Sequence, residues 1–315
     1  MTLAFFTHSA CKYDMSKVNI LKSILPFGII LQHMCTNGYP QLRTFGGIDA
    51  VIMWCFFAMS GYGLVISFIN NEKYIDGFLT RAMCKLFIPY IIALFLFIMY
   101  YTYEGINQTD LFLEKGLWSF VPASWFIWTL GYFYVFFYAI FRNIKTNIVT
   151  KVFLLCIAII AYRLIAPNIG VEYWRYDRCP GFCIGAIFAL CDKLILTNVK
   201  KWHLILSIMG CLIIRLFFTD LHYPSIIILV FTALYLIKIP TIIAESKIVR
   251  FFSSISFELY IFQFIPIYIV SKDLNITNAP TAICFIFVMN IVLATVVHKF
   301  INLIKMTNLR QRKAK

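Results

Sequence analysis

The chain has 315 residues, of which 61% are hydrophobic and only 13% carry a charged side chain. A soluble domain needs about a quarter charged residues to cover its surface, so this composition excludes a soluble fold and indicates a polytopic membrane protein. The net charge of +14 does not indicate nucleic-acid binding here, because basic residues collect in the cytoplasmic loops of membrane proteins.

Mainly apolar runs long enough to cross a bilayer recur along the chain. They predict an all-α integral membrane protein with about ten transmembrane helices. The runs lie at residues 17–35, 47–69, 83–102, 123–141, 149–167, 180–198, 202–219, 222–237, 254–271 and 281–304. The sixth to eighth runs are the weakest, and a tilted or re-entrant segment would also fit there. We expect a single membrane domain over 1–315, with short cytoplasmic tails at 1–15 and 306–315 and no soluble domain at either end.

The distribution of Lys and Arg predicts the orientation. With the N-terminus inside, about three of every four of the 28 basic residues fall in cytoplasmic loops and tails. Because this bias follows the positive-inside rule, we expect both termini in the cytoplasm. The corresponding location is the plasma membrane, which in a bacterium is the cytoplasmic or inner membrane.

The cysteines show no metal-binding pattern. The chain has 10 of them, mostly inside apolar runs, with no CxxC pair and no Cys/His cluster of zinc spacing. Cys179 and Cys183 are four residues apart, which we interpret as packed thiols. The sequence therefore predicts no metal site.

The first run contains two ionisable residues, Lys22 and His33. Eleven residues separate them by about 16 Å along a helix and return them to nearly the same face. A cation at the cytoplasmic mouth and an imidazole deeper in would suit an extended anionic donor whose reactive end must reach a general base. A snorkelling lysine and a packed histidine explain the same two residues without chemistry.

Further motifs follow in order along the chain. The second run contains Phe56-Phe57-Ala58-Met59-Ser60-Gly61-Tyr62, Arg81-x3-Lys85 and Pro89-Tyr90 mark the third, and Ser124-Trp125-Phe126 begins the fourth. Gly181-x3-Gly185 and Ser256-x3-Tyr260-x2-Gln263 occur in the sixth and ninth runs. Together with Lys22-x10-His33, this set resembles the membrane-bound acyltransferase 3 family, whose motifs include Arg-x10-His, FFxxSG and S-x3-Y-x2-H.

The resemblance implies a ten-helix O-acyltransferase. Such an enzyme moves an acyl group, usually acetyl from cytoplasmic acetyl-CoA, to a hydroxyl of a cell-surface glycan or lipid-linked sugar. It implies that His33 is the catalytic base and that Lys22 replaces the family arginine near the phosphates of CoA. It also implies donor-site roles for Arg81, Lys85, Ser60 and Gly61, and substrate contacts for Trp125, Tyr260 and Gln263.

The chain departs from the family pattern at three positions. Lys22 lacks the bidentate fork of an arginine, and Gln263 replaces a histidine, so no titrating group is expected there. The acidic residue that many members carry before the second Phe of FFxxSG is Trp54 in this chain. Asp49, at the outer start of the second run, would orient His33 and stabilise its charged form, or would simply face water at the interface.

Two further sets of charged residues are not among the defining positions of the motifs. Glu258, in the ninth run, is interpreted as the ion-pair partner of a basic residue at the donor mouth, with a direct role in the reaction as the alternative. Tyr173-Trp174-Arg175-Tyr176-Asp177-Arg178 forms an outer loop. Arg175, Tyr176 and Arg178 would bind a sugar, or the loop would form part of an interfacial aromatic belt.

A transporter, such as a flippase of a polysaccharide or lipid-linked sugar, is the competing hypothesis. It would share the apolar helices and the intramembrane charges, but such proteins often contain internal repeats with broken helices, and we find no repeat. Detecting hydrolysis of acetyl-CoA, or transfer from it, would discriminate the two. Succinyl or another short acyl group is an alternative to acetyl, and an amine is an alternative to a hydroxyl as the acceptor.

Overall fold

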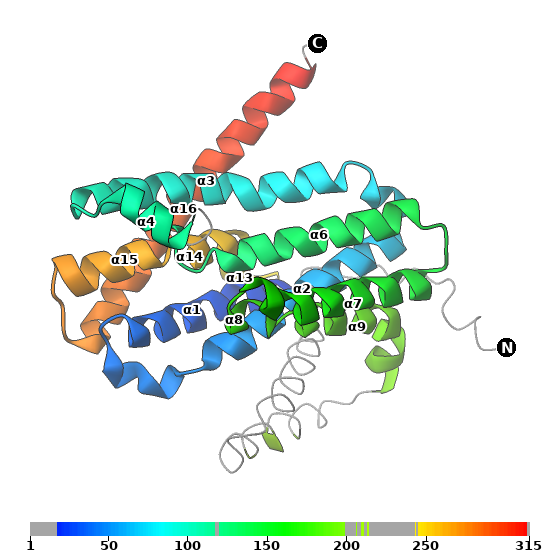
Figure 1. The fold of residues 1–315 in the computed structure, drawn as a ribbon, viewed down its shortest axis with the longest axis horizontal. Coiled ribbons are helices and arrows are strands. Elements are labelled where there is room, and N and C mark those ends of the chain that lie inside the picture. The colour runs from blue at the N-terminus through cyan, green and yellow to red at the C-terminus, as the bar shows by residue number, and fades with distance from the viewer. Residues whose placement is uncertain are drawn as a thin grey trace. The chain divides into compact units, whose positions relative to one another are not determined.

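The computed structural model describes residues 18–116, 120–198 and 245–313, with a few isolated positions between the last two ranges. Every element in these ranges is a helix, and they contain no strand (Figure 1). The predicted all-α class is thus confirmed for this part of the chain. The seventh and eighth predicted helices, 202–219 and 222–237, lie outside the described residues apart from single positions.

Seven long helices occupy predicted apolar runs. They are α1 (Val18–Thr36), α2 (Ile48–Asn70), α3 (Phe78–Tyr103), α6 (Trp125–Asn143), α7 (Ile148–Ile165), α9 (Pro180–Asn198) and α16 (Ala279–Lys313). Five spans in the described ranges, on α1, α2, α3, α7 and α16, are long and apolar enough to cross a membrane. α6 is as long as α1, but its Trp and Tyr side chains lower its hydropathy.

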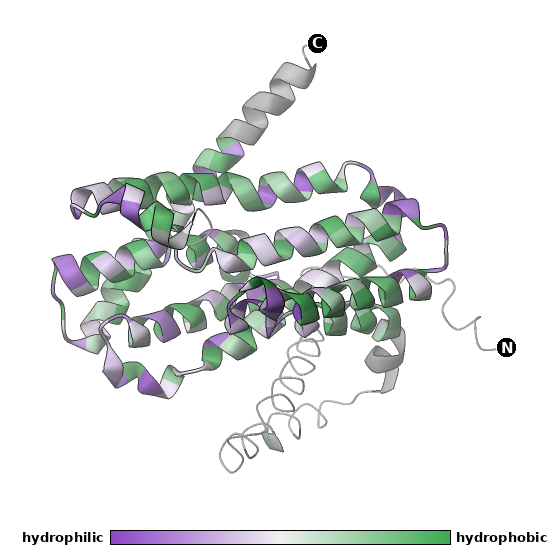
Figure 2. Ribbon diagram, viewed as in Figure 1, coloured by the Kyte–Doolittle hydropathy of each residue, from purple (hydrophilic) through white to green (hydrophobic). Residues whose placement is uncertain are grey.

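Short helices begin or connect the long ones, and Figure 2 shows that hydrophilic residues gather in these connections. They are η3 (Pro40–Phe45), η4 (Glu72–Ile75), α4 (Gln108–Lys115), η5 (Ala166–Ile169), α8 (Tyr173–Tyr176) and α13 (Lys247–Ser254). Asparagine caps η4, α4 and α7, with the side chains of Asn71, Asn107 and Asn147 accepting from backbone N–H groups in the first turn. These caps satisfy donors that a helix start leaves without partners.

The ninth predicted run is not one regular helix. It contains α14 (Ser256–Phe262), α15 (Phe264–Tyr268) and the π-helical turn η6 (Ile269–Asp273). Pro266 lies inside α15 and has no N–H to donate to the carbonyl of Phe262, which removes one helical hydrogen bond. Because the pieces are short, this run contains no single helix long enough to count as a span.

The helices belong to two compact units, which we describe separately. Unit 1 comprises the described parts of Met1–Leu21, Ala50–Thr80 and Tyr132–Val249, and unit 2 those of Lys22–Asp49, Arg81–Gly131 and Arg250–Lys315. In unit 1, Phe133 of α6 packs against both Phe57 of α2 and Phe182 of α9, with ring centroids 5.5 and 5.2 Å apart. The core of unit 1 is therefore built from aromatic side chains of α2, α6 and α9.

Three glycines bring α2 and α9 into backbone contact in unit 1. A Cβ added at Gly61 would overlap the carbonyl oxygen of Phe182, and one at Gly185 would overlap that of Ala58. A Cβ at Gly181 would lie 2.6 Å from the carbonyl oxygen of Trp54. Gly181-x3-Gly185 thus acts as a small-residue packing motif of the kind common between membrane helices.

In unit 2, α1 and α16 pack with opposite chain directions. Ile30 and Met34 of α1 share one apolar cluster with the start of α16 at Ala279, Ala282 and Ile286. One to two turns earlier on α1, Phe27 contacts Phe287 at 5.1 Å between ring centroids and packs against a second cluster, to which Ala294 of α16 belongs and against which Ile291 also packs. α14 and α15 contact the same helix, as Figure 1 shows.

Candidate active site

The candidate donor cations lie on α1 and α3 in unit 2. Lys22 is half-buried in the first turns of α1, and Lys85 is exposed on α3. Their positive charges are close enough to repel each other. Arg81 precedes Lys85 by one helical turn, which puts both side chains on the same face of α3. This end of unit 2 can therefore attract an anion.

The imidazole of His33 packs against an aromatic ring near the other end of α1. Its centroid lies 4.6 Å from that of Phe264, the first residue of α15. The backbone carbonyl of His33 accepts hydrogen bonds from Asn37 Nδ2 at 2.7 Å and Thr36 Oγ1 at 3.0 Å. These bonds tie down the last turn of α1, so His33 is held on a fixed segment about 16 Å from Lys22 by helical rise.

Asp49 lies in the first turn of α2 and is half-buried. A carboxylate at this position stabilises the positive end of the helix dipole. This structural role is compatible with both interpretations of Asp49 from the sequence, the one that orients His33 and the one that faces water.

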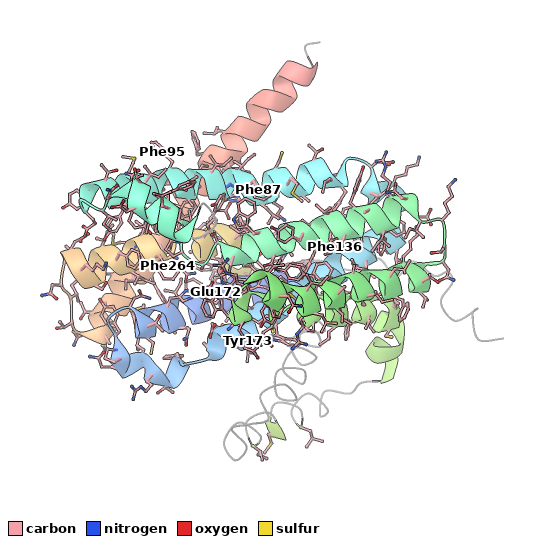
Figure 3. The ribbon with its side chains drawn as sticks, viewed as in Figure 1. Phe87, Phe95, Phe136, Glu172, Tyr173 and Phe264 are labelled. Carbon is pink, nitrogen blue, oxygen red and sulfur yellow. The ribbon has the colours of Figure 1, made fainter. Side chains whose placement is uncertain are left out.

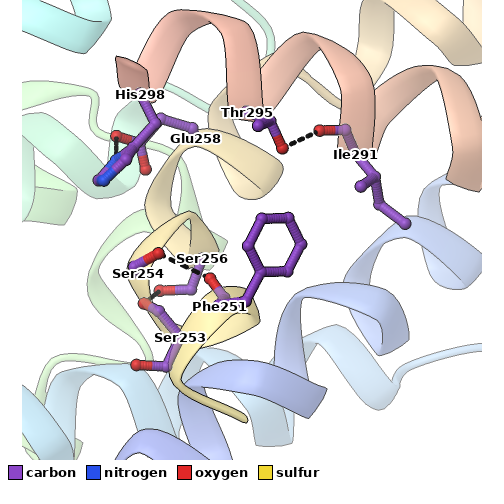
Figure 4. Close-up of polar contacts among 8 residues, drawn as sticks. All are labelled: Phe251, Ser253, Ser254, Ser256, Glu258, Ile291, Thr295 and His298. Atoms are coloured by element: carbon purple, nitrogen blue, oxygen red, sulfur yellow. Dashed lines mark hydrogen bonds and ion pairs between the residues drawn. The ribbon is translucent and has the colours of Figure 1, made fainter. Parts of the chain in front are cut away.

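Each named residue of Ser256-x3-Tyr260-x2-Gln263 donates a side-chain hydrogen bond to a backbone carbonyl. Ser256 Oγ donates to the carbonyl of Ser253 at 3.0 Å, which closes the junction of α13 and α14 (Figure 4). Tyr260 OH donates to the carbonyl of Ala123 at 2.7 Å, and Gln263 Nε2 donates to that of Tyr260 at 2.8 Å. The motif therefore organises the ninth run and the segment that leads into α6.

Trp125 begins α6 directly after that segment. Its ring contacts Phe126 with centroids 6.2 Å apart, and Phe126 in turn contacts the ring of Tyr260 at 5.5 Å. The fourth-run and ninth-run motifs, which are far apart in the sequence, thus meet in unit 2.

Glu258 pairs with a histidine that the sequence analysis did not single out. His298 Nδ1 of α16 lies 2.8 Å from Glu258 Oε1, and the Glu258 side chain is only 7% exposed (Figure 4). The register of α1 and α16 puts this pair toward the Lys22 end of unit 2. His298 is ionisable and lies inside the apolar run 281–304, a combination that marks a candidate functional residue in a membrane helix.

Asn290 of α16 is a second residue that the sequence analysis missed. It is fully buried, and its Nδ2 donates to the carbonyl of Leu259 at 2.9 Å. An isolated amide in the run Cys284–Val297 was the signal available in the sequence, because polar side chains inside apolar membrane helices commonly bind another helix or a ligand.

Ser60 and Gly61 lie on α2 in unit 1. Gly61 faces the backbone of α9 at Phe182, and Ser60 makes a side-chain hydrogen bond with Tyr134 of α6. Both contacts join helices of unit 1. A role of these residues at the donor site stays a prediction.

The 173–178 segment of unit 1, which contains α8, is held by polar contacts within itself and with Glu172 and Arg163. Arg175 Nη2 lies 2.6 Å from Glu172 Oε2, and Arg178 Nη1 donates to the carbonyl of Trp174 at 2.8 Å. Asp177 accepts from Arg163 at 3.4 Å, and the rings of Tyr173 and Tyr176 meet edge to face. Glu172 and Tyr173, at the start of this segment, are labelled in Figure 3. Both arginines predicted to bind a sugar, Arg175 and Arg178, thus already have partners.

Among the described residues, no group of three or more His, Cys, Asp or Glu side chains could hold a metal ion. Burial raises the pKa of the Cys179 thiol, so this thiol stays protonated and packs as a small apolar group. Cys183 lies inside unit 1 as well, with its sulfur 3.9 Å from the carbonyl of Cys156.

Most of the candidate residues lie in one unit. Unit 2 holds Lys22, His33, Asp49, Arg81, Lys85, Trp125, Glu258, Tyr260 and Gln263, and unit 1 holds Ser60, Gly61, Arg175, Tyr176 and Arg178. One compact unit therefore contributes both expected catalytic residues and all three expected donor-site cations. The other two expected donor-site residues, Ser60 and Gly61, belong to unit 1.

Comparison with protein families gives a match over most of the chain. The acyltransferase domain model of the acyltransferase 3 family matches residues 15–299. No curated protein and no solved structure matches the chain. The match includes every motif from Lys22-x10-His33 to Ser256-x3-Tyr260-x2-Gln263, so the resemblance noted in the sequence is confirmed. The chain belongs to the membrane acyltransferase 3 family.

Proposed function

We propose that the protein transfers an acetyl group from cytoplasmic acetyl-CoA to a hydroxyl of an extracytoplasmic glycan or lipid-linked sugar. Membership of the acyltransferase 3 family supports acyl transfer over the competing hypothesis of a flippase. Under this proposal the chain has about ten transmembrane helices, both termini in the cytoplasm and a location in the plasma membrane.

One arrangement in unit 2 carries the proposal. Lys22 and Lys85 bring two positive charges together at one end of α1, and His33 lies about 16 Å further along the same helix. An extended pantetheine arm has a comparable length, so a CoA diphosphate beside the lysines would bring its thioester to the imidazole. The diphosphate also relieves the repulsion between the two ammonium groups.

His33 is the general base of the proposed reaction. It takes the proton of the acceptor hydroxyl while the oxygen attacks the thioester carbonyl. The carbon–sulfur bond breaks, the acetyl group becomes an ester of the acceptor, and the CoA thiolate leaves and takes up a proton. Phe264 packs against the imidazole and limits its movement, which keeps the base in one orientation for the attack.

The test separates binding from chemistry in purified protein supplied with acetyl-CoA and an acceptor glycan. His33→Ala should lower kcat by about 10²–10⁴-fold, because a positioned base is lost. Lys22→Ala should instead raise the KM for acetyl-CoA, and the wild-type KM should rise with salt because the contacts are ionic.

Lys272→Ala is the matched control. Lys272 belongs to unit 2 but lies in η6, where it stacks over Tyr268 at 5.0 Å, and its loss should leave the KM for acetyl-CoA unchanged. Normal transfer by His33→Ala would remove the catalytic assignment. An equal KM for Lys22→Ala and the wild type would remove the donor assignment.

A further inference from the structure

In unit 2, two buried carboxamide side chains donate hydrogen bonds through their NH2 groups, but their oxygen atoms accept none from the part of the chain that the structure describes. Gln263 and Asn290 are both fully buried. Their NH2 groups donate to the carbonyls of Tyr260 and Leu259, two successive residues of α14. Among the described residues, neither Gln263 Oε1 nor Asn290 Oδ1 has a hydrogen-bond partner. A buried amide oxygen without a donor is costly in an apolar environment, so both oxygens favour a ligand that carries N–H or O–H groups.

The two oxygens differ in their position along α1. Asn290 lies between Phe287, whose ring contacts Phe27, and Ile291, which packs against the same apolar cluster as Phe27. Phe27 follows Lys22 by five residues and precedes His33 by six, which is about 7.5 Å and about 9 Å of helical rise. Gln263 immediately precedes Phe264, whose ring contacts His33. From the lysine end, the order is therefore Lys22, Asn290, then Gln263 beside His33.

The hydrogen bonds of the two NH2 groups fix the orientation of the carboxamides. Each NH2 group is committed to a carbonyl of α14, and this fixes the rotation of the amide plane. Asn290 is flanked on its own face of α16 by Ile286 and Ala294, both fully buried and apolar. Neither residue offers a donor to the amide oxygen, so the acceptor is held in place and available.

We propose that Asn290 and Gln263 bind the pantetheine arm of the acyl-CoA donor, an inference that rests on the proposed function. The arm carries two amide groups between the diphosphate and the thioester. Gln263 Oε1 accepts from the N–H of the amide nearer the thioester, and Asn290 Oδ1 accepts from the N–H of the amide nearer the diphosphate. The order of the protein groups along α1 matches the order of these groups in the donor.

Truncated donors test each contact separately. S-acetylpantetheine keeps both amides but lacks the nucleotide, and S-acetyl-N-acetylcysteamine keeps only the amide nearer the thioester. Asn290→Leu should raise the KM for acetyl-CoA and S-acetylpantetheine roughly three- to tenfold, the loss expected for one hydrogen bond. It should leave the KM for S-acetyl-N-acetylcysteamine unchanged. Gln263→Met should raise the KM for all three donors.

A purely structural role for Asn290 predicts a different result. It would alter transfer from all three donors by the same factor, and this outcome, or no change at all, would overturn the inference. If Asn290→Leu does not fold, Asn290→Ser keeps a hydroxyl donor for Leu259 on a shorter side chain, and the same dependence on donor length is expected. Failure of the wild type to transfer from any donor would instead refute the proposed function.

Discussion

Tyr260 shows how one side chain of unit 2 fixes backbone that is distant in the sequence. Ala123 has a φ of +62°, in the left-handed region that costs a non-glycine residue about 1–2 kcal/mol. Tyr260 donates to its carbonyl, and Tyr101 donates to the carbonyl of Phe120 three residues earlier. The two hydroxyls hold the segment that leads into Trp125, so the strain at Ala123 is offset by contacts from α3 and α14.

Removing this hydroxyl should loosen the start of α6. Tyr260→Phe should lower the free energy of unfolding by about 1 kcal/mol, because one buried hydrogen bond is lost, and should reduce transfer because Trp125 and Phe126 move. Thermal unfolding in detergent and the transfer assay measure the two effects. Tyr103→Phe is the control, since Tyr103 is 79% exposed and its change should stay within about 0.5 kcal/mol. A Tyr260→Phe protein as stable and active as the wild type would contradict the anchoring role.

At the scale of elements, α2 and α9 of unit 1 approach each other at backbone contact distance. Gly61 of the FFxxSG motif and Gly185 of Gly181-x3-Gly185 face each other's helix backbone. Lipid chains are as apolar as leucine, so membrane helices associate through close packing rather than through hydrophobic burial. Small residues at these positions are therefore a packing requirement of the fold.

Adding one methyl group to this contact should destabilise unit 1. Gly185→Ala would place a Cβ against the backbone carbonyl of Ala58, and a backbone shift of this kind costs about 1–3 kcal/mol. Gly131→Ala is the matched control on α6, because its Cβ would meet Phe87 at an ordinary 3.8 Å. The melting temperature in detergent should fall for Gly185→Ala and hold or rise for Gly131→Ala. Equal melting temperatures would show that α2 and α9 do not approach this closely.

At the scale of the whole molecule, the distribution of charge bears on the sidedness of the proposed reaction. The predicted orientation puts Lys22, Arg81 and Lys85 at the cytoplasmic side, and His33 lies about 16 Å outward along α1. A donor bound this way delivers its acyl group through the protein without the alternating access of a transporter.

This arrangement predicts transfer across a sealed membrane. In oriented proteoliposomes, acetyl-CoA on the cytoplasmic side should support acetylation of an acceptor enclosed on the other side. Vesicles with His33→Ala protein should show none, because the base is absent. A requirement for both substrates on the same face would refute transfer across the membrane and would leave the acyltransferase activity intact.

The sequence by itself determined the helical class, six of the seven long helices to within two residues at their starts, and the family. Apolar length and hydropathy are local properties, and an ordered set of motifs identifies a family without any contact being known. α3 begins at Phe78, five residues before the predicted run. Residues 78–82 are less apolar than the run but are already helical, and the helix starts directly after Gly77, which has a positive φ. Lys22-x10-His33 could be found in the same way, because both residues lie on one helix.

Only the tertiary structure decided which residues meet. The partnership of Glu258 with His298, the donation from Asn290 to Leu259, and the contact of Tyr260 with Ala123 join positions 31 to 137 residues apart. Periodicity within one helix cannot show which face of another helix it meets. The division of the ninth run into α14, α15 and η6 has a local cause instead, because Pro266 removes one hydrogen bond within the run. The order of the polar groups along α1 depends on how α16 packs against α1, so the sequence alone could not predict it.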